Sequence, residues 1–333
     1  SGLQKEIHAR IPNTVDYLEL TRNVTDNKPY GYIKIAEGCD NRCTYCIIPS
    51  LRGEFRSRSV ENIVREAGML ANKGKKEIIL IAQDVTRYGT DIYGEKRLVP
   101  LVRELSKVEG IERIRLLYCY PELIDDDLIN EMKNNEKLVK YLDIPIQHIS
   151  DRILKAMGRR GNREYIIRLL EKIRHEIPGV VLRTSLITGF PGETEEDFNE
   201  LYDFVKESRF EHLGVFAYSR EEGTPAYKMK GQIPKKIREA RRNKLMELQK
   251  ENVEKYNSTR TGRIYDTIVD GVAEDGIFYV GRTYAETPDI DPVIYFTSPE
   301  PLETGALVPV KILCPDGYDL VGEAQTIGRN GEQ

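Results

Sequence analysis

The segment GCDNRCTYC, residues 38–46, carries the strongest chemical signal in this chain. It brings Cys39, Cys43 and Cys46 within eight residues, with an aromatic residue directly before the last cysteine. No fourth cysteine or histidine lies nearby. A structural zinc site uses four protein ligands, and cubane iron–sulfur clusters are normally held by four cysteines. Three thiolates alone therefore predict a [4Fe-4S] cluster with one open iron, available to a substrate or cofactor.

Short apolar runs alternate with amphipathic stretches on both sides of this segment. The runs predict strands at Tyr30–Ala36, Glu77–Ala82, Arg113–Cys119, Tyr141–Ile146, Val180–Ile187 and His212–Tyr218. The stretches predict helices near residues 59–73, 97–108, 125–134, 150–157, 162–176 and 194–207. Alternating strands and helices form parallel βαβ units, so the sequence predicts an α/β fold, a partial TIM-like (β/α)6 barrel. The cysteine segment follows the first strand, where such barrels carry their chemistry.

The character of the chain changes after residue 233. Pro234–Thr259 is a long, charge-rich helical pattern, which we interpret as a solvated connecting helix. A surface for RNA is the alternative, because its basic side chains outnumber its acidic ones. From Gly262 onward, β-runs separated by turn residues predict a small all-β barrel of about five strands. Its strands are expected at Arg263–Asp270, Gly276–Arg282, Pro292–Phe296, Leu307–Leu313 and Tyr318–Thr326.

Composition sets the class of protein. The chain has 333 residues, of which 40% are hydrophobic and 31% charged, with a formal net charge of −4, as expected for a soluble chain of two domains. No apolar run approaches the ~20 residues of a membrane span, and no signal peptide opens the chain, so no membrane partner is expected. Five cysteines, three of them clustered, argue against a disulfide scaffold and for a reducing cytoplasm. The start at Ser1-Gly2 suggests a fragment.

These observations divide the chain into five parts. We expect residues 1–28 to be a lead-in from a missing N-terminal domain and residues 29–233 to form the α/β core. Residues 234–261 are the connecting helix, residues 262–328 the β-barrel, and residues 329–333 a tail.

The cysteine segment resembles the cluster motif of the radical S-adenosylmethionine (SAM) superfamily. The resemblance implies that the amino and carboxylate groups of SAM chelate the open iron. Electron transfer then cleaves SAM to methionine and a 5′-deoxyadenosyl radical, and Tyr45 lies against the adenine. A partial zinc site or three unrelated thiols are the alternatives. A zinc site would need a fourth ligand, but His8 and His148 are distant in the sequence.

Three further segments follow predicted strands: IAQDVTRYG at 81–89, YLDIPIQH at 141–148 and TGFPGET at 188–194. Together with residues 38–46 and the terminal β-module, they resemble the methylthiotransferases, in which that module is called TRAM. The resemblance covers nearly the whole chain after residue 28. It implies attachment of a methylthio group to an unactivated C–H bond, after the radical has abstracted the hydrogen.

The resemblance also implies a set of SAM contacts. Gln83 and Asp84 correspond to the segment that contacts the methionine amino group, although both could simply cap the loop after their strand. Gln147 is expected to touch the cofactor, or else to satisfy buried backbone groups. Arg183 and Ser185 interrupt an apolar strand, so we expect them to point inward toward the SAM carboxylate or ribose.

Other residues have local explanations. Thr194 and Asp197 predict a capping box at the start of a helix. His148 could satisfy buried backbone groups. Cys119 is predicted to be a buried strand residue, and Cys314 to be inert in the β-module.

The chain departs from the family in one respect. Methylthiotransferases carry an N-terminal domain with three further cysteines for a second [4Fe-4S] cluster, which holds the sulfur, but this chain has no cysteine before Cys39. We therefore expect the chain to bind one cluster at most and not to complete sulfur insertion alone. A reductant such as flavodoxin or ferredoxin is expected to supply the electron.

Charge distinguishes the two branches of the family, which modify either an adenosine in tRNA or an aspartate of the twelfth small-subunit ribosomal protein. Residues 262–327 contain twelve acidic and three basic side chains, so this module would repel RNA phosphates. A basic ribosomal protein is the complementary partner. The segment PIQH at 145–148 also resembles the protein-modifying branch. A tRNA enzyme is the second hypothesis, and an iron–sulfur carrier without SAM chemistry is the third.

Overall fold

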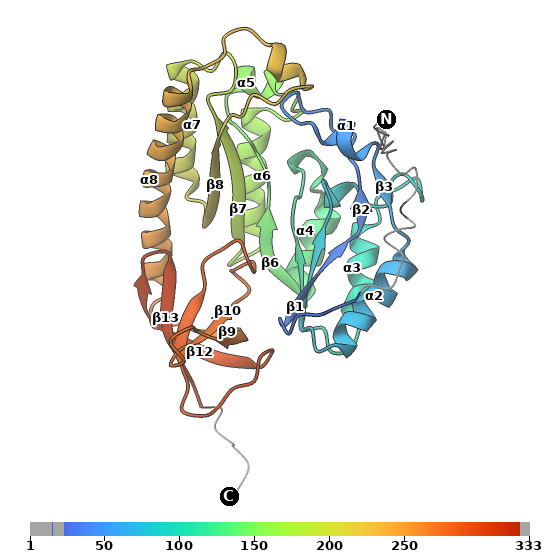
Figure 1. Ribbon diagram of the computed structural model, residues 1–333, viewed down its shortest axis with the longest axis vertical. Coiled ribbons are helices and arrows are strands. Elements are labelled where there is room, and N and C mark those ends of the chain that lie inside the picture. The colour runs from blue at the N-terminus through green and yellow to red at the C-terminus, as the bar shows by residue number, and fades with distance from the viewer. Residues whose placement is uncertain (1–14, 16–22, 327–333) are drawn as a thin grey trace, which may run out of the picture.

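A curved sheet with helices on one face lies above a small β-barrel in the computed structural model (Figure 1). The structure describes residue 15 and residues 23–326. Most of the predicted lead-in and the predicted tail therefore lie outside the described residues. The fold predicted from the sequence, a partial (β/α)6 barrel followed by a small all-β barrel, is confirmed.

Six parallel strands form the sheet, in the order β1-β4-β5-β6-β7-β8. Each pairs with the next one along the chain, as repeated βαβ units require. Strands β1 and β8 remain as the two edges, so the barrel is open. The bounds are β1 Tyr30–Lys34, β4 Glu77–Ile81, β5 Arg113–Leu116, β6 Leu138–Asp143, β7 Val181–Thr188 and β8 His212–Ala217.

Helices cover the outer face of the sheet. The main ones are α2 Val60–Asn72, α3 Leu98–Ser106, α4 Asp126–Asn134, α6 Arg163–Glu176 and α7 Glu195–Ser208. Short elements complete the connections: α1 Ile48–Arg52, α5 Asp151–Ala156, the 3-10 turns η2 Val85–Arg87, η3 Pro121–Leu123 and η4 Pro225–Lys228, and the strand pair β2 Ala36–Glu37 and β3 Arg56–Ser57.

Helix α7 illustrates why these segments are helical. Its buried Phe198, Leu201 and Val205 recur at three- and four-residue spacing, so they form one stripe that packs into the main core. Burial of each such side chain contributes ~1.5–3 kcal/mol. The predicted capping box is confirmed, because Thr194 accepts from the Asp197 amide and Asp197 accepts from the Thr194 amide.

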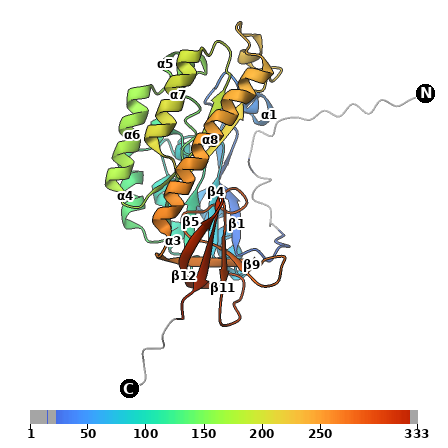
Figure 2. The ribbon, with the colours of Figure 1, turned by 90° about the vertical axis from the view of Figure 1, so that its left-hand side faces the viewer.

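Helix α8, Lys235–Arg260, runs along the molecule toward the small barrel (Figure 2). We expected a solvated helix, and this expectation was wrong. The helix buries Leu245, Leu248 and Val253 and contacts α7, β7, β8 and β12. Even its charges are partly internal, since Arg241 is buried and pairs with Glu193 at 2.6 Å.

The C-terminal barrel consists of five strands closed in the order β10-β11-β13-β12-β9. Val269, Ile294 and Phe296 are fully buried in its own small core. The bounds are β9 Ile264–Val272, β10 Tyr279–Arg282, β11 Ile294–Thr297, β12 Leu307–Asp316 and β13 Asp319–Ala324.

The loop between β10 and β11, residues 283–293, packs against part of the inner side of the parallel sheet; we call it the barrel plug. Successive side chains of a strand point to opposite faces. Leu142 and Leu182 accordingly join the helix-covered core, while Tyr141 and Val181 pack in a separate cluster with Ala285 of the plug. The two faces of the sheet are thus covered by different parts of the chain.

Buried ion pairs join the C-terminal barrel to the sheet. Glu77 of β4 accepts from Arg115 Nε at 2.7 Å and from Arg282 Nη1 at 2.6 Å, and all three side chains are at most 1% exposed. Arg282 also pairs with Asp270 at 2.6 Å. Because charges this deep are stable only when paired, the network fixes the C-terminal barrel on the sheet.

No helix among the described residues combines the length and the apolar character needed to cross a lipid bilayer.

Candidate active site

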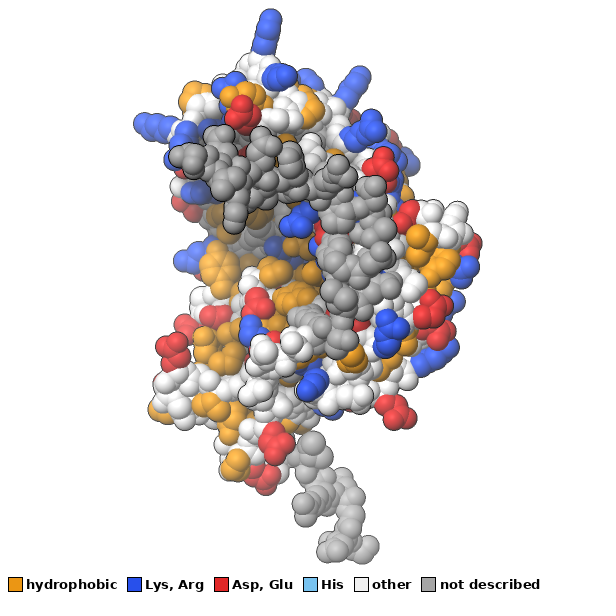
Figure 3. Space-filling model, turned by 45° about the vertical axis from the view of Figure 1, so that its right-hand side comes forward, with side chains coloured by type: hydrophobic (Ala, Val, Ile, Leu, Met, Phe, Trp, Pro, Cys, Tyr) orange, Lys and Arg blue, Asp and Glu red, His pale blue; other side chains and the backbone are white. Residues whose placement is uncertain are grey.

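A cavity of about 640 Å³ lies where the predicted site residues meet. All three cysteines of the 38–46 segment line it, together with side chains at or after the carboxyl ends of β1, β4 and β6 and side chains along β7. Hydrophobic side chains gather on the hollowed face above the C-terminal barrel (Figure 3). The predicted placement of the cysteine segment at the mouth of the partial barrel is confirmed.

The cysteine segment is held on two sides by backbone hydrogen bonds. The Cys39 amide donates to the Gly53 carbonyl at 3.1 Å, and the Thr44 amide donates to the Met157 carbonyl at 2.9 Å. Gly38 has a positive φ of 83°, and a Cβ atom there would stand 2.0 Å from the Glu54 carbonyl oxygen. Only glycine permits this close approach, so the backbone around the segment is tightly specified.

The three cysteines are free thiols, each partly exposed to the cavity. Burial raises the pKa of Cys39 to about 11 and also raises the pKa of Cys46. Such thiols become thiolates when a metal displaces the proton, and metal binding is coupled to that release. The other two cysteines do not join them, since Cys119 is fully buried and Cys314 is exposed in the C-terminal barrel.

The cysteines do not surround a single ion. Within the described part of the chain, no three side chains of Cys, His, Asp or Glu are grouped so that they could hold one metal ion. A zinc ion needs each sulfur about 2.3 Å from one centre. A cluster of several irons spreads its ligands over different metal atoms. Among the described residues that line the cavity, no His, Asp or Glu is present as a fourth zinc ligand, so three thiolates fit a [4Fe-4S] cluster with one open iron.

Tyr45 lines the cavity from within the cysteine segment. Its ring also packs against a small apolar cluster that contains Met157, Phe190 and Tyr218. Burial raises the pKa of the Tyr45 hydroxyl well above its ordinary value. The ring is thus held in place by its neighbours while part of it remains available to the cavity.

The adjacent residues Gln83 and Asp84 lie in different environments, because only Gln83 lines the cavity. Gln83 lines the cavity, donates to Glu37 Oε1 at 3.3 Å, and has a buried Oε1 without a hydrogen-bond partner in the described part of the chain. That oxygen is an orphaned acceptor beside the cysteines.

Asp84 is fully buried and lies outside the lining of the cavity. It caps η2 by accepting from the Thr86 amide at 3.1 Å, and it accepts from Asn41 Nδ2 at 2.9 Å. These bonds link the end of β4 to the cysteine segment. They correspond to the capping role that the sequence left open.

Gln147 reaches the cavity through an uncommon backbone conformation, with φ at 75°. Its amide donates to the Ser185 carbonyl at 2.9 Å, and its carbonyl accepts from the Ile187 amide at 2.8 Å. A positive φ in a residue other than glycine costs on the order of 1 kcal/mol and persists only where the surroundings fix it. The adjacent His148 is buried and accepts from the Ser150 amide at 3.0 Å, a backbone-satisfying role.

Arg183 and Ser185 both line the cavity from β7. Arg183 Nη1 donates to Asp143 Oδ1 at 2.7 Å. Burial acts to lower the pKa of Arg183, but Asp143, Tyr141 and Asp291 outweigh it and raise this pKa above its ordinary value. The guanidinium is therefore a permanent positive charge in the wall of the cavity.

Several lining residues were not predicted from the sequence: Lys34, Asn41, Tyr118, Tyr120 and Arg159. The Arg159 guanidinium lies 3.9 Å from the centre of the Tyr120 ring and donates to the Pro145 carbonyl at 2.9 Å. The two tyrosines follow β5, so the strand-end rule could have identified them. No sequence signal marks Arg159, which follows a short helix.

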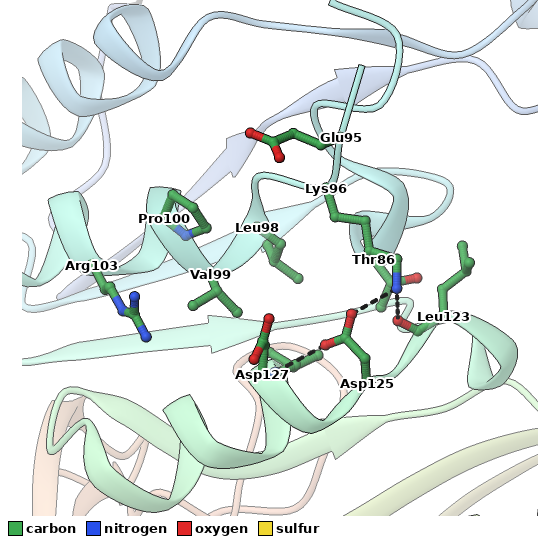
Figure 4. Close-up of a pocket in the computed structure, with 11 residues that line it drawn as sticks. Thr86, Glu95, Lys96, Leu98, Val99, Pro100, Arg103, Leu123, Asp125 and Asp127 are labelled. Atoms are coloured by element: carbon green, nitrogen blue, oxygen red, sulfur yellow. Dashed lines mark hydrogen bonds and ion pairs between the residues drawn. The ribbon is translucent and has the colours of Figure 1, made fainter. Parts of the chain in front are cut away.

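A second cavity of about 300 Å³ lies between α3 and α4 (Figure 4). Its one inward-facing lysine, Lys96, is already bound to Asp125 at 2.7 Å and to the Leu123 carbonyl at 3.1 Å. None of the predicted site residues lines it. This cavity is separate from the cysteine segment.

Family models match both parts of the chain. The model for the radical SAM superfamily matches residues 33–205, and the model for the TRAM domain matches residues 261–324. The structure of the radical S-adenosylmethionine methyltransferase TsrM from Kitasatospora setae has a TM-score of 0.50 and 20% identity, over 59% of this chain and 38% of that protein. At this identity the likeness supports the fold alone.

Similarity to curated proteins extends over nearly the whole chain. The ribosomal protein uS12 methylthiotransferase RimO of Acetivibrio thermocellus is 60% identical over 320 residues, which cover 96% of this chain and 71% of that protein. The RimO of Clostridium tetani is 51% identical over 319 residues, with the same two coverages of 96% and 71%. Together with the cysteine-lined cavity, these matches show that the chain belongs to the radical SAM superfamily and, within it, to the RimO family of methylthiotransferases.

Proposed function

We propose that this chain carries the radical SAM site of a transferase that adds a methylthio group to the β-carbon of an aspartate in ribosomal protein uS12, and that the chain does not complete sulfur insertion alone. One observation carries the proposal. Cys39, Cys43 and Cys46 share a single cavity with Gln83 and Gln147, which follow parallel strands, and with Arg183 and Ser185, which lie within strand β7. The transferred group and the substrate in this proposal come from the names of the RimO relatives, which are ribosomal protein uS12 methylthiotransferases.

The three cysteines would hold a [4Fe-4S] cluster, and its open iron would take SAM. The bound pair supplies reductive cleavage of SAM and removal of a hydrogen atom from the substrate. The residues around it have simpler tasks. The orphaned Oε1 of Gln83 can accept from an ammonium group, and the Tyr45 ring offers a face for adenine.

Arg183 supplies the positive charge that a carboxylate requires, and Gln147 and Ser185 supply polar atoms beside it. Apolar side chains complete the lining, including Ile81, Ile187 and Phe216. A lining of this kind limits water and competing groups around a reactive intermediate.

The surface of the C-terminal barrel supports a basic protein as the partner. Some of its twelve acids are internal, since Asp270 pairs with Arg282 and Glu286 pairs with Arg260. The exposed acids still outnumber the exposed bases in this barrel: they are Asp266, Glu274, Asp275, Asp289, Glu300, Glu303 and Asp316. A surface of this sign attracts a basic ribosomal protein and repels tRNA phosphates.

A small redox protein such as flavodoxin or ferredoxin is the proposed source of the electron.

Cluster assembly is the first test of this proposal. Alanine in place of Cys39, Cys43 or Cys46 is expected to abolish the brown chromophore and the bound iron after anaerobic reconstitution. Cys314→Ser is the matched control, because this thiol is exposed and far from the cavity in the fold. A full chromophore in any of the three alanine variants would contradict the proposal, as would a tetrahedral zinc ion.

Substrate choice is the second test. Reconstituted protein is incubated with SAM and reductant in the presence of either uS12 or tRNA, and electron paramagnetic resonance follows the reduced cluster as SAM is added. Binding of uS12 with a salt-dependent affinity is expected, with no measurable binding of tRNA. Binding of tRNA in place of uS12 would support the other branch of the family. A cluster whose spectrum does not change when SAM is added would support a carrier.

A further inference from the structure

One carboxylate of the barrel plug reaches the wall of the active-site cavity. Asp291 is only 4% exposed and accepts from the Tyr141 hydroxyl at 2.6 Å and from the Thr287 amide at 2.9 Å. Its other oxygen, Oδ1, lies 3.7 Å from Arg183 Nε. His212 Nδ1 lies 3.6 Å from the same oxygen. The C-terminal barrel therefore contacts the cation that we assign to ligand binding.

Arg183 is held between two carboxylates from distant parts of the chain. Asp143, at the end of β6, accepts from Nη1 at 2.7 Å, while Asp291 faces Nε from the C-terminal barrel. The third nitrogen, Nη2, has no hydrogen bond to the described residues. It lies 3.8 Å from where a Cβ atom on Gly214 would stand, an ordinary contact distance. Gly214 and Asp291 line a neighbouring cavity of about 410 Å³, and Arg183 lines both that cavity and the active-site cavity. One edge of the guanidinium is thus left without a hydrogen bond to the described residues.

We propose that Asp291 is a positioning residue: it fixes the Arg183 guanidinium so that its free edge faces a carboxylate ligand in the cavity. The C-terminal barrel would then set the geometry of the active site as well as offering a surface to the substrate. The proposal rests on the proposed function for its ligand. That carboxylate belongs either to SAM or to the substrate aspartate.

The gain from this arrangement is entropic. A free arginine side chain loses rotamer entropy when it binds a ligand, and a guanidinium that is already held in place loses less. With Asp143 alone, Arg183 could still rotate about the axis of that one contact. A second carboxylate at Nε removes this freedom.

A purely structural role is the competing explanation, because Asp291 also holds the plug through Tyr141. The plug offers a matched control for this. Asp289, two residues earlier, accepts from the Tyr30 hydroxyl at 2.8 Å and from Lys28 at 2.9 Å, so it also joins plug and sheet. It has no contact with Arg183 among the described residues. Asp289 is more exposed than Asp291, with 48% against 4% of the side chain accessible, but both join the plug to a tyrosine of the sheet and only Asp291 contacts Arg183.

The test compares Asp291→Asn and Asp289→Asn in anaerobically reconstituted protein. Asparagine keeps one acceptor oxygen for each tyrosine hydroxyl and removes the charge, while its NH2 group places a donor where the other carboxylate oxygen stood. Dissociation constants are measured by calorimetry, first for SAM alone and then for a uS12 peptide containing the target aspartate, with SAM present. Asp291→Asn is expected to weaken one of them about tenfold, and Asp289→Asn to change neither by more than twofold. The affected ligand identifies the source of the carboxylate.

A double-mutant cycle separates positioning from structure. In an Arg183→Met background, Asp291→Asn is expected to add less than a twofold change in either constant, because its effect requires the guanidinium. Asp291→Glu keeps the charge and is expected to recover most of the affinity. It also serves as the second variant if Asp291→Asn fails to fold.

Three results would overturn the inference. These are unchanged constants in Asp291→Asn, an equal loss in Asp289→Asn, or the same tenfold loss when Arg183 is already methionine. Wild-type protein that binds neither SAM nor the peptide would instead overturn the proposed function, and with it the ligand on which the inference rests. The wild-type measurement therefore distinguishes the two failures.

Discussion

Replacement of Glu77 by glutamine is expected to destabilise the junction between the sheet and the C-terminal barrel by about 3–5 kcal/mol at neutral pH, the usual cost of leaving a buried charge uncompensated. The Glu77 carboxylate is fully buried and accepts from Arg115 at 2.7 Å and from Arg282 at 2.6 Å. Glutamine keeps one acceptor oxygen, but its amide group turns a donor toward a guanidinium. Both arginines would remain buried without their shared anion.

The pKa of Glu77 gives a second measure of the same quantity. Burial acts to raise this pKa, but Arg115, Arg282 and Arg113 outweigh it and lower it from 4.5 to about 2. A depression of this size corresponds to about 3 kcal/mol, at about 1.36 kcal/mol per pH unit. The two measures agree in order of magnitude.

Urea unfolding at several pH values is the assay. Because the folded pKa lies below the unfolded value, the stabilisation is complete above about pH 4.5 and is lost as the pH falls toward about 2. Wild-type protein should therefore lose stability across that window, and the Glu77→Gln protein should show a flatter profile there.

Glu104→Gln is the control, since Glu104 pairs with Lys107 on the surface, where both side chains are at least 47% exposed. Such a pair contributes ~0–1 kcal/mol. A loss below 1 kcal/mol in Glu77→Gln at pH 7, or an unaltered pH profile, would show that the buried network does not hold the C-terminal barrel on the sheet.

Three further changes test other parts of the structure. Gly38→Ala should lower the amount of iron bound after reconstitution and reduce the free energy of unfolding by ~1–3 kcal/mol, because the new Cβ would stand 2.0 Å from the Glu54 carbonyl oxygen. Unchanged iron binding in this variant would refute the prediction. Thr194→Ala should lower the free energy of unfolding by ~1 kcal/mol, since it removes the cap that accepts from the Asp197 amide, and an unaltered urea midpoint would count against it. Cys119→Ala should leave the bound iron unchanged, because this thiol is fully buried and does not line the cavity, so iron loss would reveal an unrecognised ligand.

Much of the architecture could be predicted because its signals are local. Strand β7 alternates and helix α7 repeats every three to four residues, so each pattern is visible within one segment. The cysteine segment carries its chemistry in nine consecutive residues. Turn residues also separate the strands of the C-terminal barrel clearly enough to count them.

The features that could not be predicted from the sequence depend on contacts between segments that are distant along the chain. Glu77 and Arg282 are 205 residues apart, and no sequence pattern around either residue predicts that they form a buried ion pair. The low apolar content of α8 suggested a solvated helix, although Leu245, Leu248 and Val253 are enough to bury one side of it. Gln83 and Asp84 were predicted to contact the cofactor together because they are adjacent in the sequence, but only Gln83 lines the cavity.

The barrel plug has a practical consequence for protein engineering. A recombinant chain that stops after α8 would uncover Tyr141 and Val181 on the concave side of the sheet and would remove Arg282, one of the two counter-ions of Glu77, so poor expression and aggregation should follow. A C-terminal barrel taken from another member of the superfamily would also leave this face of the sheet uncovered, unless residues 283–293 are kept with the sheet that they contact. Chimeras should therefore exchange these residues and their matching strand positions as one cassette.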